Sequence, residues 1–145
     1  MRPLASVLVV SALVALAACD STTDPRFVPA KDCGAPGLLV VDTLARGASP
    51  STVRSTSTVV LDYVGTLVAT RDTFDARRTT LPLGGTVPGF RNGLAGTVVG
   101  DSVRLTIPPN LGYGGRDRTD PGTGEVSIPA CSTLQFNVRV IDIVG

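Results

Sequence analysis

The side chains that could do chemistry in this chain are aromatic rings, tyrosine hydroxyls and carboxylates, because both histidine and tryptophan are absent. Phe74 directly precedes Asp75, Phe90 follows a Val-Pro-Gly sequence, and Tyr113 stands between two glycines. Rings separated by glycine and proline can line an apolar pocket in which a carboxylate or hydroxyl hydrogen-bonds a bound group. The lack of histidine removes Ser-His-Asp and Cys-His constellations and imidazole metal sites. Conventional hydrolase chemistry is therefore not expected, and no cofactor is predicted.

Three alternating segments predict the strands that would position these side chains. Apolar residues recur at every second position in residues 58–68, 102–107 and 133–143, and Tyr63 falls on the apolar face of the first segment. Tyr63 should therefore point inward. The short apolar run 37–42 predicts a further strand.

One short helix is expected to begin at Pro88, because proline suits the first helical turn and Phe90 and Leu94 fall four residues apart. Gly93 and Gly96 weaken it, so packing of the two apolar side chains must hold it. The fold class predicted is α+β, a strongly bent antiparallel β-sheet wrapped around one short α-helix.

The N-terminus predicts export. An apolar run at residues 4–18 is too short to span a bilayer but fits the core of a signal peptide. It ends in Leu-Ala-Ala-Cys19, which resembles the lipobox of bacterial lipoproteins and implies that Cys19 is acylated. An ordinary signal peptide is the alternative. We expect a lipoprotein signal peptide at residues 1–18, a flexible tether at 19–32 and one folded domain at 33–145.

Cysteine counting favours the same compartment. If lipid occupies Cys19, Cys33 and Cys131 remain as an even pair in an oxidising space, which predicts a disulfide bond. Two unrelated buried thiols are the alternative.

The charge pattern excludes some partners and sites. A formal net charge of +1 argues against nucleic acid. Arg77 and Arg78 are interpreted as a solvated turn, with contact to an acidic partner or lipid head group as the alternative. Carboxylates at 117, 120 and 125 could offer oxygen ligands to calcium, but their spacing does not fit an EF-hand and neighbouring arginines oppose a cation. No metal site is predicted.

Four motifs, in chain order, resemble an FKBP-type peptidyl-prolyl isomerase: Phe74-Asp75, Val87-Pro88-Gly89-Phe90, the segment 107–114 and Ile128-Pro129. This resemblance covers about 85 residues. It implies that Asp75, Phe90 and Tyr113 are catalytic. The resemblance also implies substrate-binding roles for five further residues: Tyr63, Phe74, Val87, Ile128 and Phe136.

The chain departs from the family pattern at three places. The segment between Asp75 and Leu83 is shorter than in the common small members and lacks their additional wall aromatic. Phe90 stands where many members have tryptophan, and the loop 114–127 is longer than usual. The resemblance implies isomerisation of X-Pro bonds in exported proteins, by desolvation in an aromatic pocket with hydrogen bonding to the substrate carbonyl. We expect a monomer anchored by lipid to the bacterial cell envelope on the periplasmic side. Two alternatives are a non-catalytic peptide-binding chaperone module with the same fold and an adhesive β-sandwich without an aromatic pocket.

Overall fold

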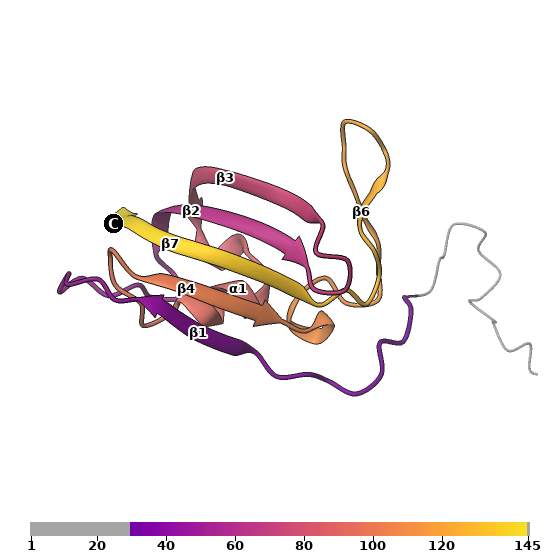
Figure 1. Cartoon of the computed structure of the whole chain (residues 1–145), viewed down its shortest axis with the longest axis horizontal. Helices are drawn as coiled ribbons and strands as arrows, with labels where there is room; N and C mark the ends of the chain where they lie inside the picture. Colours follow the sequence, from indigo (N-terminus) through magenta and orange to yellow (C-terminus); the bar gives the residue numbers. More distant parts are fainter. Residues whose placement is uncertain (1–29, 145) are drawn as a thin grey trace, which may run out of the picture.

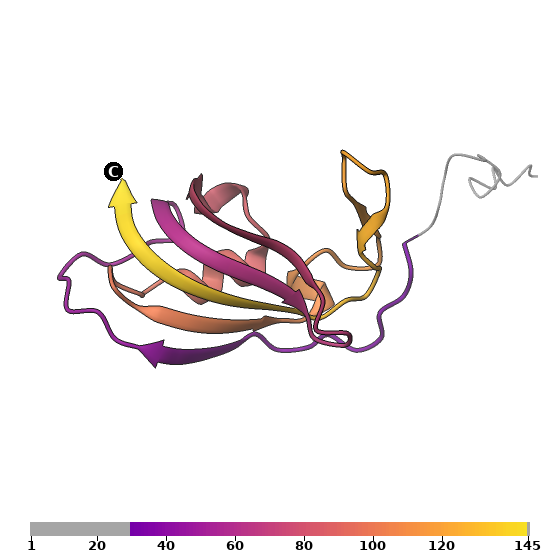
Figure 2. The same cartoon turned by 45° about the horizontal axis from the view of Figure 1, so that its top comes forward.

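The computed structural model describes residues 30–144 and contains a five-stranded antiparallel sheet with strand order β1-β4-β7-β2-β3 (Figure 1). The sheet curves strongly along β7 and β2 (Figure 2). The elements in chain order are β1 (Val40–Ala45), β2 (Thr58–Leu67), β3 (Thr73–Pro82), η2 (Leu83–Gly85), α1 (Pro88–Leu94), β4 (Ser102–Ile107), η3 (Pro109–Leu111), β5 (Arg118–Thr119), β6 (Val126–Ile128) and β7 (Leu134–Val144).

The three strands predicted from alternation are confirmed as the centre of the sheet. In β2 the side chains of Val59, Leu61 and Tyr63 are buried, while their neighbours are partly or fully exposed. The strand β4 alternates in the same way. The long strand β7 lies between β4 and β2, as expected for a long C-terminal strand. Period-two patterns are reliable here because one face of each strand packs in the core.

The predicted helix is confirmed as α1, which packs against β4. Phe90 and Leu94 are buried on one face of the helix. The approach is close because Gly89 meets Ile107 and Gly93 meets Leu105, where an added Cβ would lie 2.4 Å and 2.7 Å from the nearest side-chain atom. The glycines that weaken the helix thus let it seat on the sheet.

Two sequence expectations about strands need correction. The first strand begins at Val40 rather than at residue 37, because both backbone groups of Gly37 bond the Asn110 side chain, at 2.9 Å and 3.2 Å. The strand β3 was not predicted at all. Its Asp75, Arg77 and Thr79 pair with inward residues of β2, so its inward face is largely polar.

The loop 114–127 carries a short ribbon, in which β5 pairs with β6 and projects from the end of the sheet (Figures 1 and 2). Asp120 Oδ1 accepts backbone N–H groups of Gly122 and Thr123 at the tip of this ribbon. No group of three or more potential metal-ligating side chains occurs within residues 30–144. The same residues contain no helix long and apolar enough to cross a membrane.

Candidate active site

Four aromatic rings from separate elements meet on the inner side of the sheet. The Phe136 ring of β7 lies at the centre, with ring centroids 5.0 Å from Phe90, 5.5 Å from Phe74 and 6.0 Å from Tyr63. The pairs with Phe90 and Phe74 are edge-to-face, the arrangement that aromatic quadrupoles favour. Rings that lie far apart in the sequence therefore form one apolar wall.

A β-bulge explains how the consecutive residues Phe74 and Asp75 reach the same space. Gly65 pairs with Asp75 but Thr66 pairs with Thr73, which leaves Phe74 as an extra residue on β3. Successive side chains of a regular strand point to opposite faces, and a bulge re-aims one of them. The register shift thus places a ring and a carboxylate side by side.

The four aromatic residues and Asp75 line a cavity of about 220 Å³. Seven of the eight site residues predicted from the sequence line it, whereas Ile128 does not. Ile128 is instead buried in the hydrophobic core at the end of β6. Leu81, Gly85 and Thr86 also line the cavity and were missed. The lining residues are Tyr63, Phe74, Asp75, Leu81, Gly85, Thr86, Val87, Phe90, Tyr113 and Phe136.

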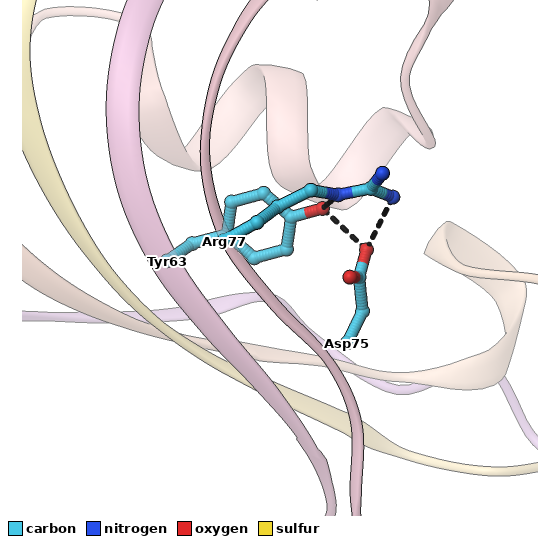
Figure 3. A network of polar contacts seen from close by, with 3 residues as sticks. All are labelled: Tyr63, Asp75 and Arg77. Atoms are coloured by element: carbon cyan, nitrogen blue, oxygen red, sulfur yellow. Dashed lines mark hydrogen bonds and ion pairs between the residues drawn. The ribbon is translucent and has the colours of Figure 1, made fainter.

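Tyr63, Asp75 and Arg77 form a polar network (Figure 3), and the first two of these residues line the cavity. The Tyr63 hydroxyl donates to Asp75 Oδ2. Arg77 donates from Nε to the Tyr63 oxygen at 2.9 Å and from Nη2 to Asp75 Oδ2 at 2.8 Å. Arg77 therefore orients the carboxylate and the phenol together.

Burial and hydrogen bonding set the protonation of this network. Burial of the phenol, followed by its hydrogen bond to Asp75, raises the pKa of Tyr63 above its ordinary value. The hydrogen bonds to Tyr63 and Asp75 raise the pKa of Arg77 above its usual range. At neutral pH the phenol thus keeps the proton that it donates, and Arg77 is charged.

Arg77 and Arg78 are exposed to solvent as expected, but the prediction that they lie in a turn is wrong, because both lie within β3. Their side chains diverge as strand alternation requires. Arg77 reaches the cavity network, while Arg78 forms a two-pronged ion pair with Asp62, with both contacts at 2.6 Å. The role of Arg77 depends on its register opposite Tyr63, which the sequence does not reveal.

The Val87 backbone N–H and the Tyr113 hydroxyl both belong to the cavity lining and have no protein acceptor within residues 30–144. Val87 immediately precedes α1, and Tyr113 follows η3. Donors without a protein partner beside an apolar wall can bind a carbonyl oxygen of a ligand. The arrangement can therefore hold an apolar group and bond its carbonyl at the same time.

The segment carrying Tyr113 is fastened on both sides. The predicted disulfide is present between Cys33 and Cys131. The Cys131 N–H donates to the Gly114 oxygen at 2.8 Å, and the Lys31 N–H donates to the Gly115 oxygen at 2.7 Å. The segment that contains Lys31 and Cys33 therefore connects the residues following Tyr113 to the segment preceding β7. Cys19, the predicted lipidation site, lies outside the described residues.

Comparison with known proteins identifies relatives. A family model described as FKBP-type peptidyl-prolyl cis-trans isomerase matches residues 49–141. FK506-binding protein 4 of Chaetomium thermophilum is 40% identical over 98 residues, which cover 63% of this chain and 19% of that protein. FKBP-type peptidyl-prolyl cis-trans isomerase FkpA of Escherichia coli K12 is 34% identical over 103 residues, which cover 68% of this chain and 34% of FkpA.

The structural comparison agrees. The crystal structure of FkpA from Escherichia coli superposes with a TM-score of 0.60 at 32% identity, covering 72% of this chain and 47% of that chain. The five-stranded sheet with one helix is therefore the fold of these proteins. This chain spans well under two thirds of the length of each of the two curated relatives.

Proposed function

Since the chain belongs to the FKBP-type peptidyl-prolyl cis-trans isomerase family, we propose that it accelerates rotation about X-Pro bonds in the aromatic cavity. The observation that carries this proposal is the convergence of four rings beside two donors that lack a protein acceptor. A prolyl ring is apolar and its preceding carbonyl is polar, so one site of this kind suits both.

The proposed mechanism relies on desolvation. Rotation about a peptide bond faces a barrier of roughly 18 to 20 kcal/mol because the planar amide is stabilised by resonance. The twisted amide has lost resonance and much of its polarity, so a dry apolar site disfavours the planar state more. The walls formed by Phe90 and Phe136 supply this environment in the proposal.

Hydrogen bonds add selective stabilisation. We assign the Val87 N–H and the Tyr113 hydroxyl to substrate carbonyl groups, where donors aimed at the rotated oxygen stabilise the transition state. Asp75 Oδ1 accepts no hydrogen bond from residues 30–144 and is assigned to the substrate side of the Tyr63 and Arg77 network. Each of these three roles is a proposal that a single substitution tests.

The test is cis-trans exchange of proline peptides measured by NMR, which requires no protease. We expect the purified chain to accelerate exchange, and Tyr113→Phe and Phe90→Leu to reduce the acceleration by several-fold or more. Leu44→Ala is the matched control, because Leu44 is exposed on β1 and does not line the cavity. Binding of unfolded chains without any acceleration would favour the peptide-binding chaperone module instead.

We further propose that the protein is exported and held at the cell envelope by lipid on Cys19, acting there as a monomer on proline-containing segments of exported proteins. The support is the apolar run at 4–18 before Leu-Ala-Ala-Cys, together with a disulfide of the kind found in oxidising compartments. Mass spectrometry should find a mature chain that begins with acylated Cys19. A mature chain beginning elsewhere, with Cys19 unmodified, would contradict the anchor.

A further inference from the structure

Arg118 covers the ring of Tyr113 at the edge of the cavity. Its guanidinium carbon lies 4.7 Å from the Tyr113 ring centroid, within the range of a cation–π contact. Tyr113 lines the cavity, whereas Arg118 does not. The arginine therefore stands at the rim, one side chain away from the space that the substrate would occupy.

The base of the ribbon holds Arg118 in this place. Arg118 pairs with Ile128, whose side chain is buried in the core. Ser127 Oγ donates to the Arg118 carbonyl at 3.1 Å, and the Ala130 N–H donates to Asp117 Oδ1 at 2.6 Å. The rim position of Arg118 is thus set by the fold and not by the exposed tip of the ribbon.

The Arg118 guanidinium forms no ion pair with another described residue. Asp75 and Arg77 compensate one another in the network beside Tyr63. Among residues 30–144, no carboxylate lies within 4.0 Å of the Arg118 guanidinium. The neighbouring Asp117 is directed away from an ion pair with Arg118, and its Oδ1 accepts the Ala130 N–H. The Arg118 guanidinium is therefore available to an incoming carboxylate.

We propose that Arg118 is a specificity-determining residue that favours substrates with an acidic side chain next to the proline. The inference rests on the proposed isomerase function of the cavity. A substrate carboxylate close to a proline that contacts Tyr113 would lie within reach of the Arg118 guanidinium. One face of this guanidinium packs on the Tyr113 ring, and its N–H groups remain available to the carboxylate. Arginine is suited to this task because its planar donor group binds carboxylates in pairs of hydrogen bonds.

The experiment uses capped peptides that carry Glu, Gln or Lys immediately before or after proline, so that the test residue is the only charge. We expect exchange to be accelerated about two- to fivefold more for a Glu peptide than for its Gln counterpart, the range of an exposed ion pair. The acceleration should be smaller for the Lys peptides than for the Gln peptides. The preference should fade at high salt because exposed charges are screened.

Variants distinguish an effect of the charge at residue 118 from an effect of the protein's total positive charge. Arg118→Gln should remove the preference and Arg118→Lys should keep part of it. Arg54→Gln is the matched control, because it removes one exposed positive charge away from the cavity and should leave the preference intact. Equal rates for all three peptide charges, or a preference that survives Arg118→Gln, would overturn the proposal.

Peptide affinity, measured in the same samples by chemical-shift titration, separates this proposal from the proposed function. If no peptide isomerises faster, the isomerase function fails, yet the affinities of Glu, Gln and Lys peptides still decide the role of Arg118. If all peptides isomerise faster without a charge preference, the role of Arg118 fails alone.

Discussion

The Phe90 ring of α1 stands edge-on to the Phe136 ring of β7, with centroids 5.0 Å apart and planes inclined at 75°. Both residues are buried, with 4% and 6% of their surfaces exposed. This contact joins the helix to a central strand of the sheet and also forms part of the cavity wall. The same pair therefore contributes to stability and to the proposed chemistry.

Removing the Phe90 ring should cost stability. Phe90→Ala is expected to lower the free energy of unfolding by about 3 to 5 kcal/mol, the usual cost of deleting a buried phenylalanine side chain. Urea denaturation measures this change. A loss below about 1 kcal/mol would mean that the cavity wall is not part of the core.

Gly65 should tolerate no side chain. An added Cβ would lie 2.7 Å from the nearest atom of Phe74 and 2.8 Å from Phe136, so Gly65→Ala must displace both rings. We expect a loss of about 1 to 3 kcal/mol in unfolding free energy and reduced isomerisation. Gly84→Ala is the control, because no atom lies within 4 Å of its added Cβ and it should leave both quantities unchanged. Unchanged activity in Gly65→Ala would contradict the proposed role of the Phe74 wall.

The raised pKa of Tyr63 predicts a loss of stability at alkaline pH. The folded protein holds the phenol proton more tightly than the unfolded chain, whose tyrosine ionises near pH 10. The stabilisation is therefore complete below pH 10 and is lost as the pH rises through the folded pKa. Tyr63→Phe should remove this component, so that stability falls less steeply above pH 10 than in the wild type. Parallel pH profiles of the two proteins would disprove the assignment.

The Cys33–Cys131 disulfide closes a loop with a sequence separation of 98. Chain-entropy estimates for such a loop give on the order of 4 kcal/mol of stabilisation. Reduction should therefore lower the urea midpoint of the wild type. It should also slow isomerisation, because the bond fastens the segment that carries Tyr113.

Cys33→Ala is the matched control for reduction. It leaves the Cys131 backbone unchanged and should behave like the reduced wild type, with no further response to reductant. A wild-type midpoint that stays constant after mass spectrometry confirms reduction would contradict a stabilising role for the bond.

The fold could be predicted where burial produces alternation, as in β2, β4 and β7. It could not be predicted for β3, because the inner positions Asp75, Arg77 and Thr79 mix charge and hydroxyl in place of an apolar series. Asp75 lines the cavity and Arg77 is largely exposed to solvent, so neither position requires an apolar side chain. The two-residue strand β5 is too short to show any period.

The cavity lining could be predicted for residues within motifs that resemble the family, but not for residues whose position depends on strand register. Arg77 acts through its position opposite Tyr63 across two strands. Leu81 reaches the cavity from the far end of β3, a strand that the sequence did not reveal. Ile128 carries the family motif, yet its side chain packs in the core.

The central claim is that X-Pro bonds rotate while the prolyl ring rests against the wall formed by Phe90 and Phe136. NMR exchange spectroscopy on one sample can record cis-trans exchange of a proline peptide together with nuclear Overhauser contacts from the prolyl ring to the protein. We predict accelerated exchange with contacts to the aromatic protons of Phe90 and Phe136. Accelerated exchange with prolyl contacts only elsewhere on the protein, or no acceleration, would contradict the account.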